Sequence, residues 1–141
     1  MTRINVVPVE ELSDQWLLAE YRELPRVIKQ EHIYVGDAPD KYCLGKGHVK
    51  FMIKHSLFCL NRYAFICREM KHRGFTVNYP YDDLDKLAED KQVVLYSEPF
   101  IPDEFDIKIN RQRLIEKYKM KPEFYKWTNR EKPNWLKGGI I

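Results

Sequence analysis

The sequence predicts an all-α fold, with residues 1–141 forming one compact domain of three helices joined by long irregular connections. Three stretches carry apolar side chains at helical spacing, and the segments between them mix glycine, proline and aspartate. The 141 residues suffice for one core but not for a separate regulatory module. Hydrophobic residues make up 44% and charged residues 32%, a composition typical of an ordered globular protein.

The first predicted helix runs from about Ser13 to about Gln30. Ser13 is a favourable N-cap and Asp14 gives the first turn a negative charge, and both features indicate a helix start. Pro25 removes one helical hydrogen bond, so we expect a bend beside Glu23. The apolar stripe contains Leu17, Tyr21, Leu24 and Ile28. The polar face contains Trp16, Arg22, Glu23, Arg26 and Gln30.

Two further helices are predicted downstream. The second runs from about Ser56 to Arg73 and is apolar on several sides, which predicts a central position. The third begins near Glu104 and stops before Pro122, with a row of cations on one side. Glu31 to His48 reads as a loop, and residues 75–103 as an irregular, packed connection. The row of cations consists of Arg113, Lys117 and Lys121.

The composition argues against several classes of protein. Apolar stretches are interrupted by charges before reaching membrane-spanning length, and the N-terminus has no hydrophobic signal core, so we expect a cytoplasmic, membrane-free protein. The cysteines and histidines show no spacing typical of a disulfide framework or a metal site, so we expect no metal and no cofactor. These residues are Cys43, Cys59, Cys67, His32, His48, His55 and His72.

Charge is distributed unevenly along the chain. Twenty-four Lys and Arg against twenty-one Asp and Glu give a net charge of only +3. Acidic residues gather between Tyr81 and Asp106, whereas Lys108 to Lys137 is rich in lysine and arginine, which suits a phosphate backbone. The tail also interleaves rings and cations in Phe124-Tyr125-Lys126-Trp127. These rings could form a stacking surface for DNA, or core aromatics flanked by solubilising lysines.

The N-terminus carries a possible nucleophile. The small Thr2 side chain permits removal of Met1, which would leave a free α-amino group. An α-amine has a pKa of about 7.7–8.0 against about 10.4 for lysine, so far more of it is unprotonated near neutral pH. Arg3, Arg22 or Arg26 nearby would lower that pKa further. Many chains share a small second residue, so this feature alone does not indicate catalysis.

Glu23 has two interpretations. Between Arg22 and Arg26 it could belong to a solvated helix face with weak ion pairs. It could also be a carboxylate held ionised by two cations, suited to stabilise positive charge on a sugar and to accept a proton. Residue spacing does not separate these alternatives.

Four segments together resemble one known family. MTRIN at 1–5, LAEYRELPRV at 18–27, LGKGHVKF at 44–51 and RGF at 73–75 are similar to the phage endonuclease V type of pyrimidine-dimer DNA glycosylases. The weaker matches IPDE, RLIEK and FYKW follow in the same order. The resemblance implies an all-α domain whose N-terminal segment is threaded between helices.

The resemblance also implies a bifunctional DNA repair enzyme. Such an enzyme excises the 5′ base of a cis-syn cyclobutane pyrimidine dimer through an imine (Schiff base), then cleaves the abasic strand by β-elimination. These roles would fall on Thr2 and Glu23. The implied partner of the monomeric enzyme is double-stranded DNA containing UV photoproducts or abasic sites, with a nucleotide flipped out. The DNA contacts would come from Arg3, Arg22, Arg26, Trp16, Arg113, Lys117, Tyr125, Lys126 and Trp127.

Two departures from the family pattern qualify this interpretation. Trp16 replaces the family's usual histidine, and it could stack on a base beside the lesion or pack inward against the third helix. The segment from Glu31 to Lys46 is shorter and less basic than the family's loop, which predicts weaker scanning of undamaged DNA. Two other functions stay open from the sequence: a metal-dependent nuclease using Asp103 and Asp106, and a non-catalytic DNA-binding module.

Overall fold

A computed structural model describes residues 4–30, 35–93 and 97–137 of the chain. Across these residues the helices are α1 (Asp14–Lys29), α2 (His48–Lys54), α3 (Ser56–His72), α4 (Tyr81–Asp90) and α6 (Glu104–Met120). Three short 3-10 turns add η1 (Val9–Glu11), η2 (Pro122–Phe124) and η3 (Asn134–Leu136). The described residues contain no strand, so the predicted all-α class is confirmed. None of the described helices is both long and apolar enough to cross a membrane.

The three predicted helices correspond to α1, α3 and α6. The Ser13 hydroxyl caps α1 by accepting from the Trp16 N–H at 3.1 Å. Gly74, with a φ of +86°, follows the end of α3, where a left-handed residue is favourable. At the start of α6, Asp103 and Asp106 each accept from the other's backbone N–H, forming a capping box. Local sequence signals therefore mark all three of these helices.

The predicted count of three helices is wrong, because the described residues contain two more helices, both in the connections. α4 occupies the middle of residues 75–103, which we expected to be irregular. Its apolar side is narrow, with Leu84 and Ala88 buried and Leu87 partly buried, and the helix is only ten residues long, so few apolar positions mark it. α2 is only seven residues long and follows Gly47, at the end of the predicted loop. The described part of that loop, residues 35–47, contains no helix.

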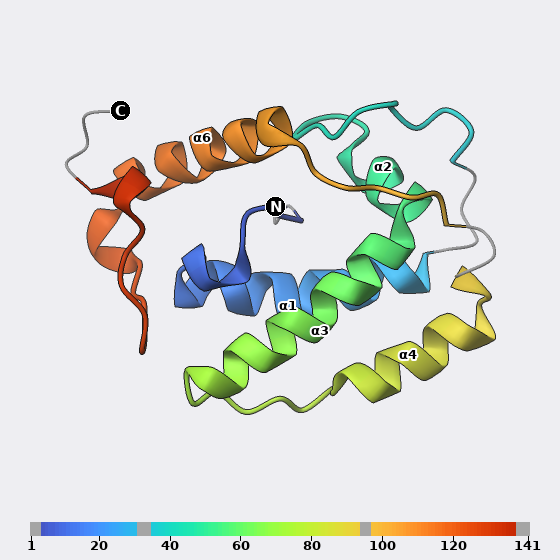
Figure 1. Ribbon diagram of the computed structural model, residues 1–141, viewed down its shortest axis with the longest axis horizontal. Coiled ribbons are helices and arrows are strands. Elements are labelled where there is room, and N and C mark those ends of the chain that lie inside the picture. The colour runs from blue at the N-terminus through green and yellow to red at the C-terminus, as the bar shows by residue number, and fades with distance from the viewer. Residues whose placement is uncertain (1–3, 31–34, 94–96, 138–141) are drawn as a thin grey trace.

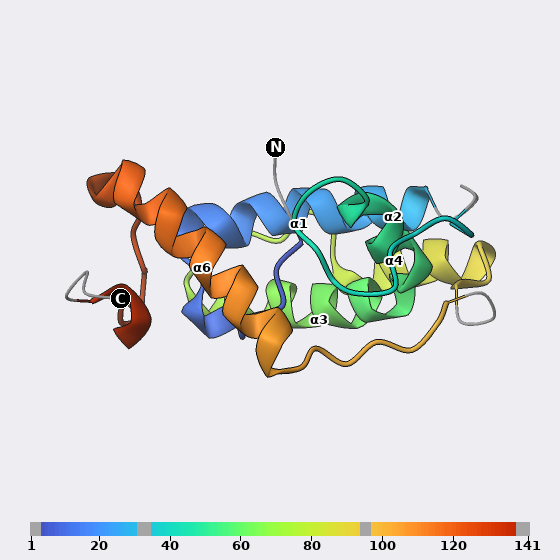
Figure 2. The ribbon, with the colours of Figure 1, turned by 90° about the horizontal axis from the view of Figure 1, so that it is seen from above.

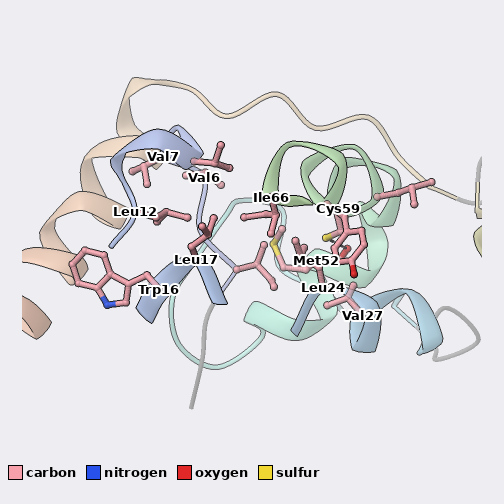
Figure 3. Close-up of a cluster of buried hydrophobic side chains, with 14 of the residues drawn as sticks. Val6, Val7, Leu12, Trp16, Leu17, Leu24, Val27, Met52, Cys59 and Ile66 are labelled. Carbon is pink, nitrogen blue, oxygen red and sulfur yellow. Dashed lines mark hydrogen bonds between the residues drawn. The ribbon is translucent and has the colours of Figure 1, made fainter. Parts of the chain in front are cut away.

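The helices surround one core. α1 and α3 pack against each other through the middle of the molecule, while α4 and α6 lie on opposite sides of them (Figures 1 and 2). Leu17 and Leu24 of α1 meet Met52 of α2 and Ile66 of α3 in this core (Figure 3). The N-terminal segment passes between α6 and the α1 and α3 pair before η1 begins (Figure 1). Its position confirms the expected threading between helices for residues 4–8.

Candidate active site

Side chains from three other parts of the chain hold the N-terminal segment. The Ile4 N–H donates to His48 Nε2 at 2.9 Å, and the Ile4 carbonyl accepts from the Tyr42 hydroxyl at 2.8 Å. The Val6 and Val7 N–H groups both donate to Asn110 Oδ1, at 2.7 and 3.2 Å. These side chains satisfy backbone groups that would otherwise be buried without a partner. The segment is thereby fixed without belonging to a helix or a sheet.

The contacts of His48, Tyr42 and Asn110 with the N-terminal segment form a clamp, and a buried ion pair reinforces it. The Glu20 side chain is 0% exposed, and both of its oxygens accept from the Arg62 guanidinium, at 2.5 and 3.1 Å. Glu20 Oε1 also accepts from the side-chain amide of Asn5 at 2.9 Å, and Arg62 donates to the Val7 carbonyl at 2.8 Å. A buried charge is tolerated only when it is paired and hydrogen-bonded in this way. Glu20 and Arg62 therefore tie the N-terminal segment to α1 and α3.

Glu23 lies one turn further along α1 and has a different environment. Its side chain is 28% exposed and accepts from Arg26 Nη1 at 3.0 Å, while the Arg26 side chain is 67% exposed. Glu23 and Arg26 line a pocket of about 400 Å³. The other lining residues are Ile4, Val27, Gln30, His48, Val49 and Met52. The carboxylate of Glu23 and the fixed N-terminal segment thus share one pocket.

A second cavity lies between α1 and α6. This groove, which we call the α1–α6 groove, has a volume of about 420 Å³ and includes Asn5, the residue next to Ile4. The two cavities therefore flank the N-terminal segment. The groove brings together cationic and aromatic side chains predicted to contact DNA, namely Trp16, Arg22, Arg113, Lys117 and Tyr125.

Trp16 is a packed residue in this groove. It is 7% exposed, and its ring lies 4.7 Å from that of Tyr125 and 6.1 Å from that of Trp127, measured between centroids. Its Nε1 is buried without a hydrogen-bond partner. This position favours the inward-packing alternative over stacking on DNA. The inward partners are the rings of the C-terminal tail, not α6 alone.

The C-terminal tail docks on the first turn of α1. The Lys126 carbonyl accepts from the Asp14 N–H at 2.7 Å, and the Lys126 N–H donates to Gln15 Oε1 at 3.1 Å. The indole of Trp127 donates to the Glu11 carbonyl at 3.0 Å. Trp127 is therefore partly buried in the fold, whereas Lys126 is exposed. A packed Trp127 beside an exposed Lys126 favours the alternative of core aromatics flanked by lysines, and DNA contact by the tail stays a prediction.

The remaining predicted residues are distributed as follows. Arg22 is exposed and lines the groove rather than the Glu23 pocket, so the expected placement of Glu23 between two arginines holds for Arg26 alone. Thr2 and Arg3 lie outside the described residues. Asp103 and Asp106, the carboxylates of the nuclease alternative, serve as helix caps. Within the described part of the chain, no group of three or more His, Cys, Asp or Glu side chains could hold a metal ion.

Sequence reasoning missed the residues that hold the N-terminal segment: Tyr42, His48, Glu20, Arg62 and Asn110. The hydrogen bonds of these residues to the segment join positions between 15 and 104 residues apart in sequence. No local spacing encodes such contacts. The one available signal was the Gly45-Lys46-Gly47-His48 turn, in which two glycines directly precede a histidine that is buried in the structure.

Comparison with known families agrees with this geometry. A family model described as pyrimidine dimer DNA glycosylase matches residues 1–83, which is more than half of the chain. The match includes the N-terminal segment, Glu23 and His48, while α6 and the C-terminal tail lie beyond it. The resemblance carried by the N-terminal motifs is thereby confirmed, and the chain belongs to the pyrimidine dimer DNA glycosylase family.

Proposed function

We propose that this glycosylase attacks C1′ of the 5′ nucleotide of a cyclobutane pyrimidine dimer with the α-amino group of Thr2, after removal of Met1. The observation that carries the proposal is that Ile4, fixed by His48 and Tyr42, lines the pocket of Glu23. Two residues of extended chain span at most about 7 Å, so Thr2 is within that reach of Ile4. The amine and the carboxylate can therefore act on one sugar.

An α-amine suits this reaction better than a lysine. With a pKa of about 7.7–8.0, a substantial fraction of an α-amine is unprotonated at neutral pH, whereas lysine at about 10.4 is almost fully protonated.

The proposed reaction needs no external cofactor. The amine nitrogen forms a bond to C1′ as the glycosidic bond breaks, and the departing base takes a proton while staying joined to its neighbour through the cyclobutane ring. The C1′–O4′ bond then opens, O4′ takes a proton, and an imine forms between C1′ and the protein. Loss of a C2′ proton expels the 3′ phosphate by β-elimination, which cuts the strand. Hydrolysis of the remaining imine releases the amine.

Glu23 would assist two of these steps. As a carboxylate at the pocket wall it stabilises the positive charge that develops on the sugar as the base departs. It is also the candidate base for the C2′ proton, because its partial exposure leaves it open to substrate. Its ion pair with the exposed Arg26 is a weak one, so this pair does not commit the carboxylate to the fold.

The α1–α6 groove would hold the DNA backbone next to the pocket. Arg22, Arg113 and Lys117 line it from both sides, and Lys126 is exposed on the adjoining tail. Arg113 lines this groove, and its guanidinium carries N–H donors suited to phosphate oxygens. In this proposal Tyr125 and Trp16 line the groove, Trp127 packs against Trp16, and Arg3 adds a further phosphate contact.

Mild periodate tests the nucleophile directly. Periodate cleaves the vicinal amino alcohol of an N-terminal threonine to an aldehyde, which removes the amine and leaves internal threonines intact. We expect treated protein to lose both base excision and the borohydride-trapped adduct with abasic or dimer-containing duplex, in the absence of any metal. Full trapping after complete conversion of the N-terminus would overturn the proposal.

Thr2→Ala provides the matched control for the same reagent. This variant keeps an α-amine but lacks the vicinal hydroxyl, so periodate does not remove its amine. Its activity before and after treatment, whatever the starting level, reports only on oxidation elsewhere, such as at cysteine or methionine. Loss in the natural protein without loss in Thr2→Ala assigns the effect to the amine.

A further inference from the structure

His48 is a buried histidine that the chemistry above does not use. It is 2% exposed, yet it lines the same pocket as Glu23 and Ile4. It is also the first residue of α2 and directly follows Gly47, whose φ is +90°. A Cβ at Gly47 would lie 2.6 Å from Pro39 Cγ, so both the left-handed turn and the tight contact require glycine there. The backbone therefore sets the direction of the imidazole.

Hydrogen-bond partners fix the tautomer of His48. Its Nδ1 lies 2.7 Å from the Cys43 carbonyl, which can only accept, so Nδ1 carries the proton. Nε2 then presents a lone pair to the Ile4 N–H at 2.9 Å. A doubly protonated ring would place one N–H against another and lose this bond. Since its lone pair is given to the backbone of Ile4, Nε2 is not available as a general base in this arrangement.

Tyr42 completes the hold on Ile4 from the other side. Burial, together with the charge of Glu20, raises the pKa of the Tyr42 hydroxyl, so the group stays protonated and donates to the Ile4 carbonyl. The Tyr42 ring also packs edge-on against the His48 ring, with centroids 5.7 Å apart. Both polar backbone groups of Ile4 are thus held by buried, mutually packed rings.

We infer that His48 is a positioning residue for the glycosylase reaction, setting where the N-terminal amine lies relative to Glu23. The inference rests on the proposed function, because it requires the amine of Thr2 to be the nucleophile. Ile4 is two positions from Thr2 in the chain, so we expect a change in its placement to shift the amine. Misplacing a reacting group by about 1 Å can cost about 100-fold in rate.

His55 offers a matched control at the other end of α2. It is also buried, its Nδ1 likewise lies 2.9 Å from a backbone carbonyl, that of Glu98, and its ring packs on Phe51 at 4.4 Å. It does not line the Glu23 pocket. A change at His55 therefore disturbs packing and one carbonyl contact without releasing Ile4.

The test compares His48→Asn, His48→Gln and His55→Asn. An asparagine amide can replace Nδ1 toward Cys43 but is too short to reach Ile4, whereas the longer glutamine can offer its oxygen to the Ile4 N–H. We expect His48→Asn to lower the single-turnover rate of base excision about 100-fold with little change in DNA affinity. His48→Gln should recover most of the rate, and His55→Asn should excise at nearly the natural rate per folded molecule.

The outcomes separate this inference from the proposed function. Periodate resistance of the natural protein would refute the Thr2 nucleophile, whatever the His48 variants do. Periodate sensitivity together with normal excision by His48→Asn would refute the positioning role alone. Equal losses in His48→Asn and His55→Asn, in proportion to the fraction unfolded, would also refute it by assigning His48 to stability. If His48→Asn does not fold, the folded His48→Gln decides the test: excision close to the His55→Asn level supports the role, and excision about 100-fold below that level counts against it.

Discussion

Glu20 and Glu23 are the same residue type, one turn apart on α1, and they have opposite environments. Glu20 is fully buried and its two oxygens are occupied by Arg62 and Asn5, whereas Glu23 is partly exposed in a pocket beside Arg26. The first carboxylate stabilises the N-terminal segment and the second remains open to substrate. The helix face, not the residue type, decides which carboxylate is committed to the fold and which is left in a pocket, where we propose that it serves the reaction.

The same contrast appears in the two outer helices. α6 adds Arg113 and Lys117 to the α1–α6 groove, while α4, on the opposite side of the molecule, exposes Asp82, Asp83, Asp85, Glu89 and Asp90 (Figure 1). A net charge of +3 conceals this asymmetry. An acidic face repels a phosphate backbone, so the charge distribution favours one orientation of the protein on DNA.

The largest expected effect is the loss of base excision on substitution of Glu23, because Glu23, but not its neighbour Glu20, is the carboxylate proposed to take part in the reaction. Glu23→Gln keeps the shape of the side chain but removes its charge, so we expect base excision to fall about 100-fold to 10,000-fold. DNA affinity should stay near the natural value, because the affected interaction belongs to the transition state. Single-turnover kinetics and a binding titration on dimer-containing duplex measure both. Excision at a near-natural rate by folded Glu23→Gln would remove Glu23 from the mechanism.

The next largest expected effect is a difference in stability between variants of Glu20 and Glu23. Glu20→Gln leaves the Arg62 guanidinium buried without its counter-charge, so we expect the free energy of unfolding to fall by about 3–5 kcal/mol. Glu23→Gln should change it by only about 0.5 kcal/mol or less, as for other partly exposed positions. Denaturant titrations of both variants make the comparison. An exposed ion pair contributes less than about 1 kcal/mol. A loss of that size in Glu20→Gln would contradict a stabilising role for the buried pair of Glu20 and Arg62.

A substitution at Trp16 tests whether this residue stabilises the wall of the α1–α6 groove by packing. Trp16→Ala should lower the free energy of unfolding by about 3 kcal/mol, since it empties a buried site between two tail rings. Release of its unpartnered indole N–H partly offsets this loss. Weakening of binding should be similar on damaged and undamaged duplex. A selective loss of affinity for damaged duplex with unchanged stability would instead support stacking of Trp16 on DNA.

The smallest expected effect compares the two outer helices. Lys117→Gln should reduce the slope of log affinity against log salt by about 0.9, the value for one lost phosphate contact. Lys86→Gln, an exposed lysine on the acidic α4, should leave the slope unchanged. Binding titrations at several salt concentrations measure both slopes. Equal slopes for the two variants would contradict the assignment of the α1–α6 groove as the DNA face.

The sequence predicted the parts of the fold that are determined by residues close together in the chain. α1, α3 and α6 are each 16 or 17 residues long and have capping signals close by, such as Ser13 and the Asp103 box. α4 was missed because its apolar side is narrow. The clamp on Ile4 was out of reach, since it depends on side chains 38 and 44 positions away that only tertiary packing brings together.

The candidate site divides in the same way. The catalytic roles of Glu23 and Thr2 are predicted from motifs near the N-terminus, in the part of the chain that the family model matches. Spacing on the helix placed Arg22 and Arg26 on one face, but it did not reveal that they line different cavities. That separation depends on α6 and the tail, which pack against only one side of the polar face of α1.

The most direct test of the central claim is to map the covalent adduct. The protein is reduced with borohydride on dimer-containing duplex, digested, and examined by mass spectrometry for the peptide that carries the sugar remnant. We expect the remnant on the α-nitrogen of the peptide that begins with Thr2. A remnant on a lysine side chain, such as that of Lys46 or Lys50 in the neighbouring loop and helix, would contradict it.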